Sequence, residues 1–300
     1  MPLVNTKQMF ADAYVNHYAV GAFNVDSIAM IQAVLQAAEN CKSPVIISLS
    51  KSSREFMHPG NIKELVLCVS KDITIPFAIH LDHGKSIQLC KDCIDEGFTS
   101  VMIDASAYDF EENIRITKEV VDYAHERNVT VEGELSILTS EEEYPSLIEE
   151  FVKRTNVDSL AISIGTGHGT SKFKKGEKPH LKFDILEKVA QRLPSFPFVL
   201  HGSSSILKKD IDIFNEFGGE IKDPIGIPEE LLRKACDMAV CKINIGTDFR
   251  VAYVGALRKS LGLIKDKYEP RNFLVPAKQA AQELVEYKLK NVFNSANKIK

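Results

Sequence analysis

PFAIHLD, residues 76–82, is a short apolar run that ends on a carboxylate, and similar runs recur along the whole chain. Runs rich in Val, Ile, Leu and Phe are typical of parallel strands that are buried on both faces. Between them lie helical patterns, such as Ile28, Ile31, Val34 and Leu35, whose spacing of three and four residues predicts one buried helix face. The runs lie at 18–25, 44–50, 76–82, 100–106, 130–136, 159–165, 196–202 and 240–246.

The alternation of strand and helix, repeated eight times, predicts an α/β fold, the (β/α)8 or TIM barrel. Such a barrel takes about 250 residues, so we expect residues 1–300 to form a single domain. The long segment 203–232 is expected to be a functional connection. A further helical pattern around Ala281 and Leu284 predicts a C-terminal helical tail. An open doubly wound sheet, the alternative, would usually carry a glycine-rich phosphate turn after its first strand, and this sequence has none.

Composition narrows the classes of protein that the chain can belong to. Hydrophobic residues make up 44% and charged residues 26%, which is ordinary for a globular protein. The net charge of −4 argues against nucleic acid as a partner. Neither a signal peptide nor a membrane-spanning run is apparent, so we expect no membrane association. Cys90 and Cys93 form the only C-x-x-C pair, in a helical pattern, which favours reduced thiols and a cytoplasmic location.

Histidines follow three of the predicted strands. His83 follows the third strand, His168 the sixth, and His201 ends the seventh. Taken singly, each would more often be a hydrogen-bonded structural residue, but the carboxyl ends of barrel strands meet at one mouth. Three protein ligands with one open position are typical of catalytic zinc, although imidazole also suits iron, copper and nickel. His80 lies inside the third strand, and we expect it to be packed in the interior.

The end of the seventh strand and the eighth strand form the usual phosphate site of such barrels. Gly202 and the serines at 203–205 offer backbone N–H groups and hydroxyls there, and Asn244 and Thr247 are expected on the same side. A serine-rich loop is often only a turn. The position of this loop, more than its composition, therefore favours phosphate binding.

Together these motifs resemble those of the class II fructose-bisphosphate and tagatose-bisphosphate aldolases, over nearly the whole chain. They are HLDHG (80–84), VEGEL (131–135), GHG (167–169), LHGSSS (200–205) and KINIGTD (242–248). The resemblance implies a zinc-dependent lyase of carbohydrate metabolism, as in glycolysis. Such an enzyme reversibly cleaves fructose 1,6-bisphosphate or tagatose 1,6-bisphosphate to dihydroxyacetone phosphate and glyceraldehyde 3-phosphate. It also implies a homodimer or larger homo-oligomer, and a monovalent cation, Na⁺ or K⁺, near the phosphate loops.

The resemblance also assigns roles to individual residues. His83, His168 and His201 would ligate zinc, and Asp82 would act as the acid/base at the C4 hydroxyl. Glu142 would exchange a proton on the other face of the substrate. The remaining positions are Glu134 and Asp104 near the zinc or a second metal, Asn24, Ser50, Gly169, Lys172, Gly202, Ser204, Asn244 and Thr247 on the substrate side, and Arg271, which would reach a neighbouring subunit's site to hold the distal phosphate.

Three departures from the family pattern bear on these roles. LSILTS (135–140) replaces the glycine-rich stretch that usually precedes the loop glutamate, and the loop up to Phe151 is about a dozen residues shorter than analogy suggests. Both leave the role of Glu142 open. Gly246 stands where fructose-bisphosphate aldolases usually carry an aspartate and tagatose-type members a small residue. The sequence therefore does not decide which sugar bisphosphate is the substrate.

The sequence also allows other functions, including cleavage of another phosphorylated ketose. A Schiff-base aldolase needs a lysine in the barrel mouth, but Lys242 lies near the start of the eighth strand. A zinc hydrolase would often carry H-x-H on its first strand, which YAVGAFNV (18–25) lacks. The shortened loop favours a third alternative, a non-catalytic metal-binding descendant.

Overall fold

The structure is a computed structural model that describes residues 2–136, 140, 142–165, 179–222 and 224–299. Eight parallel strands form a closed barrel in sequence order, with β1 paired to β8 as well as to β2. Each predicted apolar run overlaps one strand, so the predicted (β/α)8 barrel is confirmed. The strands are β1 (Val20–Asn24), β2 (Val45–Ser50), β3 (Phe77–Gly84), β4 (Ser100–Ile103), β5 (Thr130–Leu135), β6 (Ser159–Ile162), β7 (Phe198–Leu200) and β8 (Val240–Ile245).

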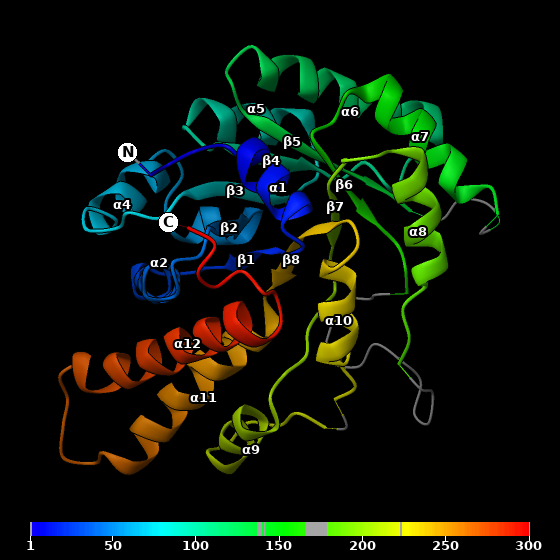
Figure 1. Cartoon of the computed structure of the whole chain (residues 1–300). Helices are drawn as coiled ribbons and strands as arrows, with labels where there is room; N and C mark the ends of the chain where they lie inside the picture. The colour runs from blue at the N-terminus through cyan, green and yellow to red at the C-terminus, as the bar shows by residue number, and fades with distance from the viewer. Residues whose placement is uncertain (1, 137–139, 141, 166–178, 223, 300) are drawn as a thin grey trace.

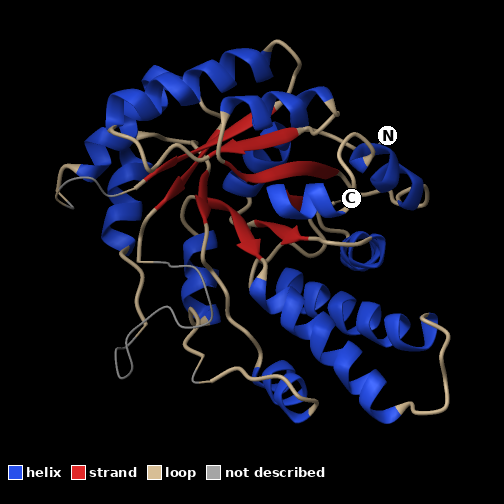
Figure 2. Ribbon diagram, turned by 180° about the vertical axis from the view of Figure 1, so that it is seen from behind, coloured by secondary structure: helices blue, strands red, loops and turns tan. Residues whose placement is uncertain are grey.

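Helices surround the barrel and cover the outer faces of the strands (Figures 1 and 2). In the described part of the chain they are α1 (Thr6–Val15), α2 (Ile28–Cys41), α3 (Lys51–Phe56), α4 (Ile62–Val69), α5 (Ile87–Asp95), α6 (Phe110–His125), α7 (Tyr144–Thr155), α8 (Phe183–Arg192), α9 (Lys208–Glu216), α10 (Glu229–Cys236), α11 (Thr247–Leu263) and α12 (Arg271–Asn291). None of these helices is long and apolar enough to cross a membrane.

Helix α2 shows how the sequence sets these elements. The Ser27 side chain caps its start by accepting a hydrogen bond from the Met30 N–H, and Lys42 ends it in the left-handed conformation. The predicted stripe includes Ile31, Val34 and Leu35, all of which are buried. The buried face of α2 therefore packs on the barrel as the spacing predicts.

The two ends of the barrel differ. Helix α1 packs across the end at which the strands begin (Figure 1), and Met9 and Phe10 meet Val20, Ala22 and other small apolar side chains there. At the opposite end the strands lead into polar residues. One end is thus sealed by apolar packing, and the other is free to hold a site.

The C-terminal third of the chain adds helices to the barrel. The connection after β7 carries a helix, α9, which the sequence did not predict. Helices α11 and α12 form an antiparallel pair, and the turn between them lies at the end away from the barrel (Figure 1). The predicted C-terminal helix, α12, packs on α11 and α2.

Candidate active site

A cavity of about 270 Å³ opens where the strands end. Residues from β1, β2, β3 and β8, from the segment after β7, and from the first turns of α3 and α11 line it. They are Asn24, Ser50, Ser52, Asp82, His83, His201, Gly202, Ser203, Ser204, Asn244, Gly246, Thr247 and Arg250. Most of the predicted site residues that the structure describes therefore meet in one cavity.

Asp82 and His83 are consecutive residues of β3, and yet both line this cavity. In a regular strand, successive side chains point to opposite faces. Here His83 has a φ of 50°, and the register of β3 against β4 shifts between Leu81 and Gly84. This local irregularity brings both side chains to the mouth, at a cost of about 1–3 kcal/mol in backbone strain.

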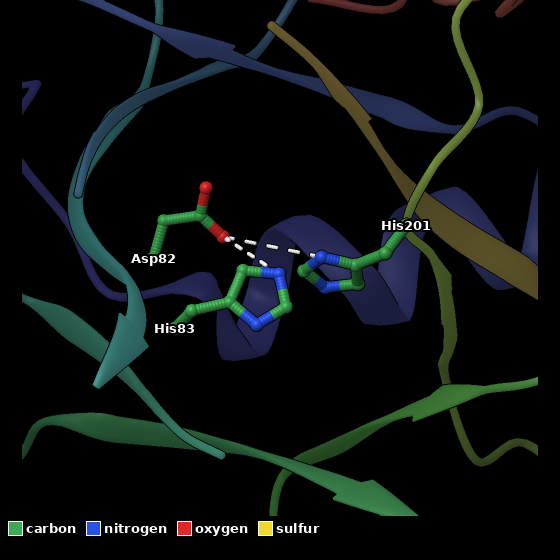
Figure 3. A group of neighbouring side chains, drawn as sticks. All are labelled: Asp82, His83 and His201. Atoms are coloured by element: carbon green, nitrogen blue, oxygen red, sulfur yellow. Dashed lines mark ion pairs between the residues drawn. The ribbon is translucent and has the colours of Figure 1, made fainter. Parts of the chain in front are cut away.

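The rings of His83 and His201 lie next to each other, with Asp82 beside them (Figure 3). Their ring centroids are 4.6 Å apart, at an interplanar angle of 71°. Asp82 Oδ1 lies 3.9 Å from His83 Nε2 and 3.9 Å from His201 Nδ1. One potential ligand atom from each residue falls within 4.8 Å of the others, so this trio could hold a metal ion.

A second group of potential ligands shares His83. His83 Nδ1 lies 2.9 Å from Asp104 Oδ2 and 3.5 Å from Glu134 Oε2. Burial acts to raise the pKa of Asp104, but hydrogen bonds from His83 and Lys85 outweigh burial and hold it far below its usual range. Burial and the neighbouring Asp104 raise the pKa of Glu134. Two close carboxylates whose pKa values shift in opposite directions are typical of functional sites.

Two asparagines hold the Asp82 carboxylate in place. Asn24 Nδ2 donates to Asp82 Oδ2 at 2.7 Å, and Asn244 Nδ2 donates to Oδ1 at 3.1 Å. Burial acts to raise the pKa of Asp82, but the imidazoles of His201 and His83 outweigh burial and lower it. Asp82 is thus an oriented, ionised carboxylate that can accept a proton.

His201 is oriented from inside the barrel by a buried carboxylate. Glu132 lies 2.7 Å from His201 Nε2 and accepts a hydrogen bond from Lys242 Nζ at 2.7 Å. Burial acts to raise the pKa of Glu132, but the Lys242 ammonium and His201 hold it far below its usual range, so Glu132 can only accept and His201 Nε2 must donate. His201 Nδ1 then lies on the Asp82 side, 3.4 Å from Asn244 Nδ2, and is the nitrogen that could ligate a metal.

Lys242 itself is completely buried, and it does not line the cavity. Its ammonium contacts Glu132 and lies 3.1 Å from His80 Nε2. Burial, followed by the Lys242 charge, lowers the pKa of His80 to about 3, so His80 is a neutral acceptor in the barrel interior. With its ammonium engaged in this way, Lys242 is not placed to form a Schiff base in the mouth.

The part of the cavity lined by residues 202–204 and Thr247 has the character of an anion site. Gly202, with a φ of 60°, leads into Ser203 and Ser204, and Thr247 begins α11 beside them. The amino terminus of a helix presents N–H groups that favour phosphate. Ser50 also lines the cavity, where its hydroxyl caps α3 by accepting from the Ser53 N–H.

Arg250 is a cavity residue that the sequence did not reveal. Its Nε donates to Asp26 Oδ2 at 3.2 Å, and its side chain adds a positive charge near Thr247 and Gly246. Arg250 follows Thr247 by three residues, a spacing that places both on the same face of one helix, and this spacing could have predicted its position. Ser52 was missed too, because it belongs to a helix that follows β2 directly.

The other predicted site residues lie elsewhere. Glu142 is exposed ahead of α7 and does not line the cavity. Arg271 is exposed and begins α12, whose first turn lies at the end of the helical pair away from the barrel (Figure 1). His168, Gly169 and Lys172 lie outside the described residues.

Comparison with known proteins shows which family the chain belongs to. The sequence model described as "Fructose-bisphosphate aldolase class-II" matches residues 4–298, nearly the whole chain. The chain belongs to this family. Its class II membership implies a divalent metal, and the imidazoles of His83 and His201, with the Asp82 carboxylate beside them, fit such an ion.

Individual aldolases are similar to this chain over nearly its whole length. A fructose-bisphosphate aldolase of Treponema pallidum is 41% identical over 323 residues, which cover 99% of this chain and 97% of that protein. One of Giardia intestinalis is 42% identical over 306 residues, with 99% and 94% covered. The crystal structure of the YdjI aldolase from Escherichia coli K12 superposes with a TM-score of 0.79, at 32% identity, and covers 99% of this chain and 100% of that one.

Proposed function

We propose that the protein is a zinc-dependent aldolase that cleaves a ketose 1,6-bisphosphate, fructose or tagatose 1,6-bisphosphate, to dihydroxyacetone phosphate and glyceraldehyde 3-phosphate. One observation carries the proposal. The ionised carboxylate of Asp82 sits beside the His83 and His201 imidazoles in a cavity whose other wall is the phosphate-type loop 202–204. In this proposal these groups would supply a base, part of a metal site and an anion site in one cavity.

The proposal gives Asp82 the task of accepting the C4 hydroxyl proton when the C3–C4 bond breaks. Asn24 and Asn244 hold its two oxygens, so the carboxylate needs no reorientation at the moment of transfer. His83 and His201, with His168 as the third ligand, would hold the metal. When bound, a divalent cation supplies Lewis-acid stabilisation of the negative charge that develops next to the substrate carbonyl.

The phosphate groups of the substrate have two kinds of partner in this proposal. The N–H groups and hydroxyls of Gly202 and Ser204, with Thr247 at the start of α11, suit one phosphate. Arg250 strengthens the positive potential of the cavity, and Arg271 of a second copy would hold the distal phosphate as a guanidinium fork. We extend the proposal to a cytoplasmic homodimer or larger homo-oligomer, and to a Na⁺ or K⁺ ion near the phosphate loop.

Gly246 bears on the choice of sugar. A Cβ built at this position would lie 3.1 Å from Asn24 Oδ1 and 3.3 Å from Arg250 Nη1, so residue 246 faces the substrate side of the cavity. An acidic side chain there would contact sugar hydroxyls, and glycine contacts none. We therefore propose weak discrimination between the fructose and tagatose bisphosphates, which differ at C4.

A coupled assay for dihydroxyacetone phosphate, run on both bisphosphates side by side, tests the function. We expect release from at least one of them, loss of release with a chelator, and recovery when zinc is added back. Borohydride with substrate should trap no adduct, because no lysine among the described residues lines the cavity. Absence of release from both substrates, or activity that survives the chelator, would overturn the proposal.

A further inference from the structure

A completely buried lysine lies behind the phosphate-type loop, outside the cavity. Lys288, in the last turn of α12, is 0% exposed. Its Nζ donates to Ser205 O at 2.8 Å, to Ser205 Oγ at 2.6 Å and to Glu229 Oε1 at 2.8 Å. A buried ammonium is tolerated only when it is paired and hydrogen-bonded. Here two of the three hydrogen bonds go to one loop residue, Ser205.

Other elements hold the same loop from behind. The Ser205 N–H donates to Asp248 Oδ1 of α11 at 2.9 Å, and this oxygen lies 3.4 Å from Lys288 Nζ. The Ile227 N–H donates to Ser204 O at 2.9 Å. The N–H, carbonyl and hydroxyl of Ser205 are therefore all engaged on the side away from the cavity, contrary to the expectation that Ser205 offers its N–H to phosphate.

The second partner of Lys288 is itself fixed. Tyr287 Oη donates to Glu229 Oε2 at 2.6 Å, so Glu229 is bonded at both oxygens by neighbouring residues of α12. Glu229 begins α10, where a carboxylate is favoured by the helix amino terminus. Lys288 thus joins the loop after β7, α10 and α12 in one hydrogen-bonded cluster.

We infer that Lys288 is a positioning residue for phosphate binding. This inference rests on the proposed function. Lys288 does not line the cavity. It holds the carbonyl and hydroxyl of Ser205 and lies beside the Asp248 carboxylate that accepts from the Ser205 N–H, so it anchors the end of the Gly202–Ser204 segment that lines the cavity. An anion site built from backbone N–H groups depends on the orientation of each peptide. The C-terminal helix thereby sets affinity for the phosphate group without contacting it.

A merely structural lysine would only balance the charges of Glu229 and Asp248. That role predicts a loss of stability with no change in the ligand affinity of the folded protein. The positioning role predicts that phosphate affinity falls while the metal site, built from β3 and the residue after β7, keeps its metal.

The test uses the full-length, zinc-loaded protein and the variants Lys288→Met and Lys288→Arg. Lys290→Met is the matched control, because Lys290 lies two residues further along the last turn of α12, where it is half exposed and paired with Glu286 on the surface. The readouts are the inhibition constant of inorganic phosphate, KM and kcat for the bisphosphate, and zinc per chain.

For Lys288→Met we expect the inhibition constant and KM to rise about tenfold or more, with zinc content unchanged and kcat within a few-fold of wild type. Lys288→Arg should recover part of the loss, since it keeps the charge and the donors. Lys290→Met should behave as wild type. Phosphate affinity within twofold of wild type in folded Lys288→Met would overturn the inference.

Removal of Lys288 leaves the buried Asp248 carboxylate and the partly buried Glu229 carboxylate without their cation, which is strongly destabilising. If Lys288→Met does not fold, Ser205→Ala carries the test, because it removes only the hydroxyl contact. A wild-type phosphate affinity in Ser205→Ala would then overturn the inference. If the wild-type protein cleaves bisphosphate while the variants bind phosphate normally, only the inference fails. If the wild type neither cleaves bisphosphate nor binds phosphate, the proposed function fails with it.

Discussion

The proposed base, Asp82, and the proposed metal ligand, His83, are neighbouring residues of one strand, and both line the cavity. The left-handed backbone at His83 makes this possible, since a regular strand would bury one side chain when the other faces the mouth. Asp82 and His83 therefore act in one cavity without a long connection between them. Their relative position is set by β3 itself.

Asp82→Asn should separate metal binding from catalysis. The amide keeps the shape and the contacts of residue 82 but cannot accept the hydroxyl proton, so kcat should fall about 10²–10⁴-fold. Zinc content, measured by elemental analysis, should stay near that of wild type because the histidine ligands remain. Asp122→Asn, an exposed change on α6, is the control. A kcat within tenfold of wild type in Asp82→Asn would rule out its role as the base.

Glu132→Gln should weaken both the fold and the metal site. Glu132 is 1% exposed and neutralises the fully buried Lys242, so losing its charge should cost about 3 kcal/mol in urea unfolding. Metal affinity should fall about 10–100-fold, because His201 loses the carboxylate that orients it.

A surface glutamate supplies the comparison for Glu132. Glu150 pairs with Arg154 on the surface of α7, where the two side chains are 49% and 39% exposed. Glu150→Gln should therefore change stability by less than about 1 kcal/mol. Equal effects of the two substitutions on stability would show that the buried pair with Lys242 carries no special weight.

At the scale of elements, the sequence predicts the strands well because each is buried on both faces and so reads as an unbroken apolar run. It does not predict the irregular end of β3, because a left-handed residue in a strand leaves no pattern in HLDHG (80–84). It also does not predict α9, since Lys208–Glu216 buries only Asp210 and therefore has little apolar stripe.

The candidate site was predictable to the extent that it follows from strand ends. His83, His201 and Asp82 do meet at the mouth, as expected from parallel strands that all end on one side. The support behind them was not predictable, because Glu132 and Lys242 come from β5 and β8, and only the closed barrel brings them together. A charged lysine inside an apolar strand was the one signal that a buried carboxylate had to lie nearby.

Glu39, in the last turn of α2, ties this helix to the segment before β3. Glu39 Oε2 accepts from the Thr74 N–H at 2.7 Å and the Ile75 N–H at 3.2 Å, and Oε1 accepts from Thr74 Oγ1 at 2.6 Å. Burial acts to raise the pKa of Glu39, but these hydrogen bonds outweigh burial and lower it below the ordinary value of 4.5. The bonds thus favour the ionised form in the folded state.

Glu39→Gln should lower stability in a pH-dependent way. A carboxyl whose folded pKa lies below its unfolded value stabilises the protein above the unfolded pKa, and the contribution is lost as pH falls through the folded pKa. Urea unfolding should therefore show Glu39→Gln about 1 kcal/mol less stable than wild type near pH 7, with the difference closing below the ordinary value of 4.5. Glu126→Gln, which is 78% exposed, should show no such trend. A constant difference across pH would contradict the assignment.

At the scale of the whole molecule, the α11–α12 pair exposes apolar side chains that a monomer rarely leaves in water. Leu263 is 62% exposed, Tyr268 86% and Val275 57%, and all lie close to the turn that precedes Arg271. An exposed apolar surface of this kind is typical of an interface. In the proposed homo-oligomer it would carry Arg271 to a partner's cavity.

Subunit complementation tests this arrangement. Arg271→Ala should raise KM for the bisphosphate about tenfold or more, since a charged fork to phosphate is lost, and Asp82→Asn should be nearly inactive. In a dimer formed from one copy of each, one site combines an intact Asp82 with an intact Arg271. Mixing and exchanging subunits should therefore restore about a quarter of the sites in a two-fold symmetric dimer. No recovery, in a sample that sedimentation shows to have exchanged, would place Arg271 outside the partner's site.

Because β1 pairs with β8, the barrel cannot close during protein synthesis until nearly all of it has been made. A ribosome adds about 5–20 residues per second, so the roughly 220 residues that follow Val20 take about 10–45 s before Lys242 can pair with it. During that time β1 keeps one edge of unpaired N–H and C=O groups, which other chains can join. The nascent, unclosed sheet is therefore the form of this protein most prone to aggregation, and it is the form that cellular chaperones would have to shield.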